Sequence, residues 1–255
     1  MRPKLNYNRQ LRSLSIVIPA YNEIRRLPLT LDRILEWLQG QQLEFCEVLV
    51  VDDGSRDGTA ALVENRAKEQ SPLRLLRNPG NRGKGYAVRS GMLAAKGEWV
   101  LFTDADLSTP IEELAKLHSR AVEGAAEIAI GSRALDPSTV EVHQSGFREW
   151  SGRFFNLVMS VVTGLPFRDT QCGFKLYSAR AAREVFTRQR LDGFSFDVED
   201  LFIARKLGIT AIEAPVRWRN VEGTKVGAWS GLRSFWDLVR IRSMGARGLY
   251  GKPVA

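Results

Sequence analysis

Cysteine and histidine are scarce in this chain of 255 residues, which contains two of each. Two thiols, Cys46 and Cys172, cannot form a disulfide framework or a cysteine-rich metal cluster. So few cysteines are typical of a reducing compartment such as the cytosol, and Cys46, inside an apolar run, is expected to be a small core residue. His118 and His143 have no ligand-like neighbours in the sequence. We therefore expect structural or solvated roles for both.

Long apolar segments are also lacking. The longest weakly polar run, residues 154–167, is broken by polar residues, glycine and proline, and it is shorter than the about 20 residues of a membrane-spanning helix. Residues 1–12 are basic and polar and do not resemble a secretory signal. We therefore expect no membrane-spanning segment, whereas binding to a membrane surface remains open.

Basic residues outnumber acidic ones, with 37 Lys and Arg against 29 Asp and Glu and a formal charge of +8. This surplus favours anionic partners, which include nucleic acid, an acidic membrane and phosphorylated substrates, and it does not choose among them. Hydrophobic residues make up 44% of the chain and charged residues 26%, which is typical of a globular protein. The length fits one large α/β domain.

Strand and helix patterns alternate through the first half of the chain. Continuous apolar runs predict buried strands over residues 14–20, 47–51, 73–76, 99–103 and 127–131. Helical spacing predicts helices over residues 27–38 and 83–95. Two further helices are expected, one that is capped by Asp57 and one that begins at Pro110. This alternation indicates an α/β fold with a doubly wound, mostly parallel sheet and helices on both faces.

The second half is less regular. Helical patterns cover residues 145–162 and 196–206, and residues 169–175 are expected to form a polar loop. In residues 229–242 apolar side chains recur at helical spacing beside arginines, which is typical of an interfacial helix on anionic lipid and also of a helix packed on the core. The chain divides into a basic N-terminal segment, a main domain and a C-terminal amphipathic segment, over residues 1–13, 14–225 and 226–255.

Polar clusters directly follow three of the predicted strands, at Pro19 to Glu23, Asp52-Asp53-Gly54 and Asp104-Ala105-Asp106. Because ligands bind beyond the carboxyl ends of the strands in such sheets, these clusters should meet at one edge. The carboxylates of Asp104 and Asp106 can share a divalent cation with a bound diphosphate, and capping of the next turn is the plain alternative. Asp52 can accept hydrogen bonds from a ribose or a base, and the Asp-Gly-Ser sequence also favours a turn.

A fourth cluster, Asn81-Arg82-Gly83-Lys84-Gly85, opens a predicted helix. Glycines allow close backbone approach, a helix N-terminus favours anions, and Lys84 would add a positive charge for a phosphate. The spacing of a P-loop is absent, and no G-x-G-x-x-G follows the first strand, so a dehydrogenase is disfavoured.

Six short segments occur in order: IVIPAYNE (16–23), VVDDGSRDGT (50–59), NRGKG (81–85), DADLS (104–108), GSR (131–133) and DTQCGFKLY (169–177). In residues, order and spacing they resemble the family 2 inverting glycosyltransferases. Within that family the chain is most similar to the dolichyl-phosphate or polyprenyl-phosphate β-glucosyltransferases, with the dolichyl-phosphate mannose synthases as relatives. The resemblance covers most of the chain and implies a GT-A fold.

The resemblance also implies a role for each matching residue. Asp104 and Asp106 would hold Mg²⁺ or Mn²⁺ on the diphosphate, with Asp106 in the catalytic centre, and Glu199 would lie near the reacting atoms. The acceptor phosphate would face Arg133, Arg148 and Lys175, of which the two arginines would be catalytic. The nucleotide sugar would be bound by Pro19, Tyr21, Glu23, Asp52, Asp53, Lys84 and Asp104.

As a whole, the resemblance implies transfer of a hexose, with inversion, from a nucleotide diphosphate sugar to a polyprenyl or dolichyl phosphate at the cytoplasmic face of a membrane. Glucose from UDP-glucose is the leading donor, and mannose from GDP-mannose is the alternative. A phosphate acceptor is largely anionic at neutral pH, so it needs positioning by arginines more than a general base. A hydroxyl acceptor would need such a base, for which Glu199 or Asp200 is the candidate.

Several departures and alternatives bear on this interpretation. Some mannose synthases have a glutamine metal ligand where Ser108 stands, which leaves the third ligand open. The Q-x-x-R-W pattern of processive polysaccharide synthases is missing, so a processive synthase is disfavoured. A nucleic-acid-binding protein would need a recognisable reader motif, and we expect no nucleic-acid partner. A catalytically silent nucleotide-sugar-binding protein would have no need of an intact Asp104 and Asp106.

Overall fold

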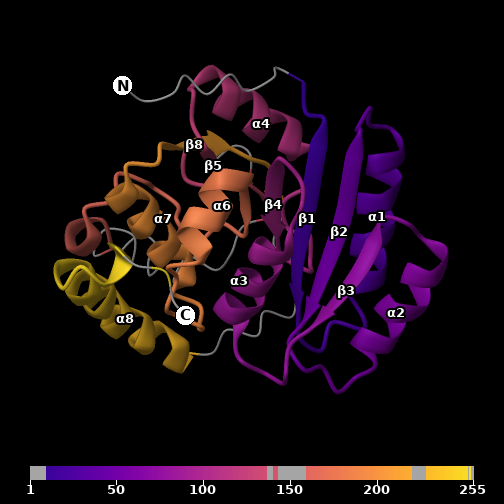
Figure 1. The fold of residues 1–255 in the computed structure, drawn as a ribbon, viewed down its shortest axis with the longest axis horizontal. Helices are drawn as coiled ribbons and strands as arrows, with labels where there is room; N and C mark the ends of the chain where they lie inside the picture. Colours follow the sequence, from indigo (N-terminus) through magenta and orange to yellow (C-terminus); the bar gives the residue numbers. More distant parts are fainter. Residues whose placement is uncertain (1–9, 137–139, 143–158, 220–227, 252, 254–255) are drawn as a thin grey trace.

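A seven-stranded sheet forms the centre of the computed structural model, which describes residues 10–136, 140–142, 159–219, 228–251 and 253 (Figure 1). The strand order is β3-β2-β1-β4-β7-β5-β8, and a second, small sheet pairs β6 with β9. The strands are β1 (Ser13–Ala20), β2 (Phe45–Asp52), β3 (Leu73–Arg77), β4 (Trp99–Thr103), β5 (Ile128–Ser132), β6 (Val140–Val142), β7 (Phe174–Ser178), β8 (Ala211–Pro215) and β9 (Trp218–Arg219).

Helices cover both faces of the main sheet (Figure 1). Their bounds are α1 (Leu27–Gln39), α2 (Thr59–Glu69), α3 (Lys84–Ala94), α4 (Glu113–Glu123), α6 (Ala179–Phe186), α7 (Phe196–Leu207), α8 (Ala228–Ala246) and the 3-10 helix η2 (Leu249–Gly251). Alternate residues of β1 point into two separate cores. Val17 belongs to the core with α3, α6, α7 and α8, whereas Ile16 and Ile18 belong to the core with α1, α2 and α4.

Most neighbouring strands run in parallel. β1 pairs in parallel with β2 and β4, and β2 with β3, so the carboxyl ends of these four strands lie at one edge. β7 is antiparallel to both β4 and β5, and β8 is parallel to β5. The predicted doubly wound, mostly parallel sheet is therefore confirmed, and each predicted strand matches an observed one to within two residues.

One predicted helix start is wrong. The helix expected from Pro110 begins at Glu113, because Pro110 lies in a turn in which its carbonyl accepts the Glu113 N–H at 3.1 Å. Gly58 occupies the N-cap position of α2, and Asp57 satisfies the first backbone donor of the helix, because its carboxylate accepts the Thr59 N–H at 3.0 Å. The same carboxylate accepts the backbone N–H of Ile24 at 3.2 Å, which joins the loop after β1 to the loop before α2.

The predicted polar loop over residues 169–175 contains the start of strand β7. Every residue of this strand is buried, including Lys175, which is 0% exposed. The lysine gave the segment a polar appearance in the sequence. Its charge is balanced in the core by Asp197 and Asp200, which come from α7 and could not be paired with it from the sequence alone.

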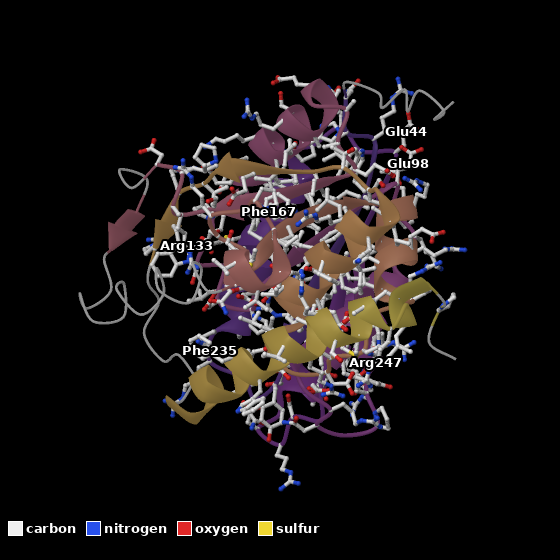
Figure 2. All side chains as sticks on the ribbon, turned by 90° about the vertical axis from the view of Figure 1, so that its left-hand side faces the viewer. Glu44, Glu98, Arg133, Phe167, Phe235 and Arg247 are labelled. Carbon is white, nitrogen blue, oxygen red and sulfur yellow. The ribbon has the colours of Figure 1, made fainter. Side chains whose placement is uncertain are left out.

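The C-terminal helix α8 crosses one face of the molecule, as Figure 2 shows, and is amphipathic. Leu238, Ile241 and Met244 are buried, whereas Trp236 is 73% and Val239 55% exposed. The helix therefore packs on the core and also presents apolar side chains to solvent. No helix in the described ranges is long and apolar enough to cross a membrane. The helix predicted over residues 145–162 lies largely outside the described residues. Residues 159–163, which the structure describes, are helical.

Both cysteines and His118 have the expected structural character. Cys46 is half-buried and Cys172 is buried. His118 is buried with its ring centroid 5.3 Å from that of Trp99, and burial lowers its pKa. His143 lies outside the described residues.

Candidate functional site

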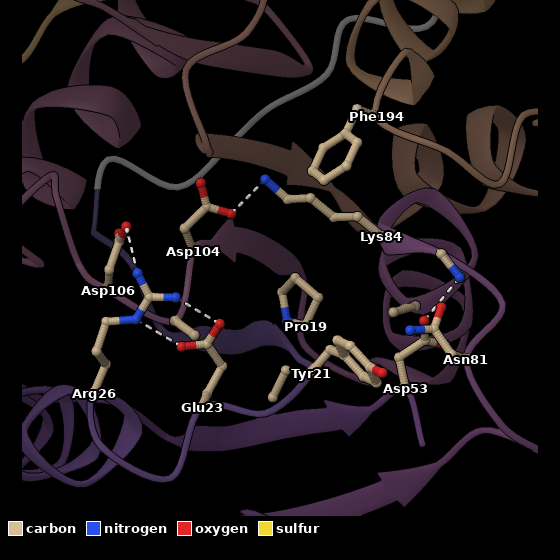
Figure 3. Close-up of a pocket in the computed structure, with 14 residues that line it drawn as sticks. Pro19, Tyr21, Glu23, Arg26, Asp53, Asn81, Lys84, Asp104, Asp106 and Phe194 are labelled. Atoms are coloured by element: carbon tan, nitrogen blue, oxygen red, sulfur yellow. Dashed lines mark hydrogen bonds and ion pairs between the residues drawn. The ribbon is translucent and has the colours of Figure 1, made fainter. Parts of the chain in front are cut away.

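A pocket of about 420 Å³ opens where β1, β2 and β4 end (Figure 3). Its position beyond the carboxyl ends of the parallel strands is the one expected for a ligand site in such a sheet. The residues that the sequence suggested and that line it are Pro19, Tyr21, Glu23, Asp53, Lys84, Asp104 and Asp106. The polar clusters after the three strands therefore meet, as predicted.

Asp104 follows β4 and lies beside the positive charge of Lys84. The Lys84 Nζ is 2.7 Å from Asp104 Oδ1 (Figure 3). On its other side the carboxylate rests against the backbone of Gly173, whose carbonyl accepts the Asp104 N–H at 3.2 Å. A Cβ atom at Gly173 would lie 2.1 Å from Asp104 Oδ2. The glycine of the DTQCGF segment is therefore required by the position of this carboxylate.

Asp106 is oriented by the residues that follow it. The Ser108 N–H and hydroxyl donate to Asp106 Oδ1 at 3.1 and 2.9 Å, so Ser108 supports the carboxylate here. Arg26 NH1 lies 4.0 Å from Asp106 Oδ2. Burial, and then the nearby charge of Asp104, raise the pKa of Asp106.

The pair of Asp104 and Asp106 fits a hard divalent cation. Within the described residues, no three Asp, Glu, His or Cys side chains are grouped as a metal site. One or two carboxylates completed by substrate phosphate oxygens are, however, the usual protein contribution to Mg²⁺ binding. Burial and, after it, the like charge of Asp104 raise the pKa of Asp106, and a cation bound to the two carboxylates would offset both effects.

Glu23 is held by Arg26, a pocket residue that the sequence did not reveal. The Arg26 Nε and NH2 donate to the two oxygens of Glu23 at 2.7 Å each. The Glu23 N–H donates to Thr59 Oγ1 at 2.9 Å, which fixes the loop after β1 against the start of α2. Arg26 thus links Glu23 to Asp106 (Figure 3). Arg26 lies outside the IVIPAYNE segment, which ends at Glu23, so no motif in the sequence indicated a role for it.

The two aspartates at the end of β2, Asp52 within the strand and Asp53 just after it, have different surroundings. Asp53 lines the pocket and accepts from Asn78 Nδ2 and the Gly83 N–H, both at 2.8 Å, so it also fixes the loop before α3. Asp52 is buried, accepts the Ser55 N–H at 3.3 Å and does not line the pocket. For Asp52 the structure favours the turn-forming role over direct nucleotide contact.

Gly83 and Gly85 allow the chain to pack closely on itself. A Cβ at Gly83 would lie 2.4 Å from the carbonyl oxygen of Asp192, and one at Gly85 would lie 2.6 Å from that of Leu191. The segment that precedes α7 therefore closes against the N-terminus of α3. The close approach that the two glycines permit is to protein, whereas the side chain of Lys84 turns into the pocket.

Arg133 follows β5 and is paired with the buried Asp169. Its Nε and NH2 donate to the two oxygens of Asp169 at 2.7 and 2.8 Å, and its guanidinium carbon is 5.3 Å from the Trp218 ring centroid. The side chain is 31% exposed and lies outside the lining of the pocket. Arg148 falls outside the described residues.

Lys175 and Glu199 are fully buried and do not line the pocket. The Lys175 ammonium contacts Asp197 and lies 3.5 Å from Asp200 Oδ2. Glu199 accepts the hydroxyl of Tyr250 at 2.9 Å. The implied contact of Lys175 with an acceptor phosphate and the implied place of Glu199 near the reacting atoms do not fit these positions, because both side chains are engaged by core partners.

Phe194 is another pocket residue that sequence reasoning missed. It comes from the segment between α6 and α7 and is 43% exposed. Its only signal in the sequence is a large apolar residue beside Gly193 in a short polar stretch, which is not enough to indicate a binding role.

Solved structures with the same fold are sugar-transferring enzymes. Mannosyl-3-phosphoglycerate synthase from Rubrobacter xylanophilus has a TM-score of 0.67 at 20% identity, over 93% of this chain and 75% of that one. Glucosyl-3-phosphoglycerate synthase from Mycobacterium tuberculosis, in complex with UDP, has a TM-score of 0.62 at 19% identity, over 96% of this chain and 82% of that one. At these identities the likeness concerns the fold, which is the GT-A fold of glycosyltransferases.

The chain belongs to glycosyl transferase family 2, whose model matches residues 15–186. It is 39% identical over 240 residues to the dolichyl-phosphate beta-glucosyltransferase of Drosophila melanogaster, over 89% of this chain and 74% of that protein. It is 35% identical over 243 residues to the human protein of the same name, over 91% of this chain and 75% of that protein. The resemblance drawn from the six segments is confirmed, and the protein is a glycosyltransferase.

Proposed function

We propose that this protein transfers glucose from UDP-glucose, with inversion, to the phosphate of dolichyl phosphate or another polyprenyl phosphate. The names of its relatives, which align over most of the chain, support this choice of donor sugar and acceptor. The structural observation that carries the proposal is the pocket in which Asp104, Asp106 and Lys84 meet at the edge of the sheet.

The donor would lie along the pocket, with the nucleotide near Tyr21 and Asp53 and the diphosphate near Asp104 and Asp106. Lys84, at the first position of α3, would add its charge and the positive end of the helix to the diphosphate site. Mg²⁺ or Mn²⁺ held by the two aspartates would neutralise charge on the departing diphosphate. The pocket volume, about 420 Å³, lies within the usual range for small-molecule sites.

The acceptor phosphate would be positioned by arginines. An oxygen of the phosphate would form a bond to the anomeric carbon while the bond from that carbon to the diphosphate breaks, so that UDP leaves and an α-linked donor gives a β-linked product. Asp169 fixes the plane of the Arg133 guanidinium, and arginine suits a phosphate because it donates several N–H groups in one plane. Arg148 is the second arginine of this proposal.

A hydroxyl acceptor is less well supported. It would need a general base within hydrogen-bonding reach of the acceptor. Glu199 and Asp200, the two candidates, are each 0% exposed and bonded to Tyr250 and Tyr177 respectively. A phosphate acceptor has no such requirement, which favours it.

Peripheral binding at the cytoplasmic face of a membrane would bring the enzyme to a lipid acceptor. Trp236 and Val239 are exposed on α8 beside Arg240 and Arg242, which are also exposed. Aromatic and apolar side chains beside cations suit the interface of an anionic membrane. In this proposal residues 14–225 form the catalytic domain and residues 226–255 the membrane-associated segment.

A panel of donors tests the proposal. The purified protein would be incubated with polyprenyl phosphate, Mg²⁺ or Mn²⁺, and UDP-glucose, UDP-galactose or GDP-mannose, and the lipid product would be quantified. We expect a glucosylated lipid from UDP-glucose and none after chelation of the metal. Transfer from GDP-mannose alone, or release of free glucose without a lipid product, would contradict the proposal.

A further inference from the structure

The segment Gln189 to Ser195, which joins α6 to α7, is fastened to the N-terminal end of α3. The Gln189 Nε2 donates to the Gly85 carbonyl at 2.9 Å. The guanidinium of Arg89, on α3, donates to the Gln189 carbonyl at 3.1 Å and pairs with Asp192 at 2.9 Å. The helix that carries Lys84 and this segment therefore form one rigid wall of the pocket.

Glu199 fastens the same segment from the core side. Its carboxylate accepts the N–H groups of Arg190 at 3.1 Å and Leu191 at 2.8 Å, and the hydroxyl of Tyr250 at 2.9 Å. A fully buried carboxylate that satisfies two backbone donors of one loop has a positioning role. Glu199 therefore acts on the segment and not on the substrate.

Phe194 is the exposed tip of this otherwise fixed segment. It lines the pocket together with Lys84 and Asp104, and Figure 3 shows its ring on the same side of the pocket as these two residues, where the diphosphate would lie. Its side chain is 43% exposed. An aromatic ring held in water by a rigid loop is a preformed surface for an apolar group.

The other end of the segment is bonded to α8. The Ser195 hydroxyl donates to Asp237 Oδ2 at 2.8 Å. Two neighbours of Asp237 on this helix are exposed: Trp236 is 73% exposed and Val239 is 55% exposed. The segment that carries Phe194 is therefore fixed to α3 beside the pocket and to α8 at Asp237.

We propose that Phe194 is a specificity-determining residue that packs against the first isoprenoid units of the lipid acceptor, and that Glu199 positions the segment that presents it. This inference rests on the proposed function. A lipid phosphate that reacts beside Asp104 must carry its apolar chain away from the charged diphosphate end of the pocket. Phe194 is the large apolar side chain at that end, and its segment leads to α8.

Acceptor kinetics with a water-soluble isoprenoid phosphate test the inference. Citronellyl phosphate contains two isoprenoid units and needs no membrane, so effects on membrane binding are removed. We expect Phe194→Ser to raise the KM for citronellyl phosphate about tenfold, because roughly half a phenylalanine side chain loses its apolar contact. The affinity for UDP-glucose with Mg²⁺, measured by calorimetry, should stay at the wild-type value, and Phe194→Leu should restore most of the acceptor KM.

Leu93→Ser is the matched control. Leu93 is also 43% exposed but does not line the pocket, so this variant should leave both constants unchanged. A Phe194→Ser enzyme with an unchanged acceptor KM would overturn the inference, and so would a loss confined to UDP-glucose affinity, which would place the ring on the sugar. If wild-type protein glucosylates neither citronellyl nor polyprenyl phosphate, the proposed function itself fails, which is a distinguishable result.

Discussion

Gly173 determines where the Asp104 carboxylate can lie. The two residues are brought together because β7 runs antiparallel to β4, so that Gly173 stands beside the end of β4. A single methyl group at this position would meet Asp104 Oδ2 at 2.1 Å. At the scale of single residues, this glycine is as necessary to the site as the aspartate, although it contributes no side chain.

We therefore predict that Gly173→Ala abolishes most transfer while the protein stays folded. Displacing Asp104 by about 1 Å should lower kcat/KM by about 100-fold or more. Initial rates of glucosyl transfer and a circular dichroism melt would measure the two effects. Gly40→Ala is the control, because a Cβ there would have its nearest neighbour at an ordinary 3.5 Å; equal rates for the two variants would contradict the prediction.

Asp200 gives a prediction about pH and stability. Burial raises its pKa to about 7, above the value of about 3.9 for an unfolded chain. Between these values the folded state binds more protons than the unfolded state, so this group lowers stability as the pH rises from about 4 to 7. The contribution is unfavourable above pH 7 and disappears below the unfolded pKa.

Replacing Asp200 by Asn should remove this dependence. The stability of the variant relative to wild type should rise by about 1–2 kcal/mol between pH 5 and pH 7, measured by urea unfolding. Asp32→Asn, at an exposed position, should show no comparable trend. A constant difference between Asp200→Asn and wild type across this range would show that Asp200 stays charged throughout.

At the scale of whole elements, buried parallel strands were predictable and β7 was not. β1, β2 and β4 appear in the sequence as continuous apolar runs because both of their faces are covered. β7 has the same burial but contains Lys175, whose partners Asp197 and Asp200 are supplied by α7. Pairing between distant segments hides such a strand from any local pattern.

Helix α8 packs on the core with one side and presents apolar side chains to solvent with the other, so it has features of both a core helix and an interfacial helix. Because Leu238 and Ile241 belong to the core, deleting the helix would damage the fold as well as any membrane contact. Point variants on the exposed side separate the two effects. Trp236→Ser with Val239→Ser should reduce flotation with vesicles that contain about 30% phosphatidylserine, and should leave the melting temperature within about 2 °C of wild type.

Leu29→Ser provides the control for this prediction. Leu29 is 67% exposed on α1, which packs on the opposite face of the sheet. Flotation of this variant should match that of wild type. Undiminished flotation of the α8 double variant would remove the membrane role of this helix and leave only its role in the core.

At the scale of the whole molecule, the meeting of the polar clusters in one pocket followed from the sequence, whereas the surroundings of the residues implied for the acceptor did not. Strand ends of a parallel sheet converge by topology, so the polar clusters after β1, β2 and β4 could be placed together without a structure. The position of Arg133 depends on its pairing with Asp169, which is 36 residues away along the chain. Glu199 and Lys175 were assigned by resemblance, and their burial depends on the packing of α7 against β7 and η2.

The central claim is that separate strand ends gather their acidic groups around one cation that is shared with a diphosphate. Titration of Mn²⁺ by electron paramagnetic resonance, in the presence of UDP, tests it most directly without relying on turnover. We predict one tight Mn²⁺ in the wild-type complex and at least about 100-fold weaker Mn²⁺ binding in both Asp104→Asn and Asp106→Asn. Wild-type Mn²⁺ affinity in both variants would contradict the account.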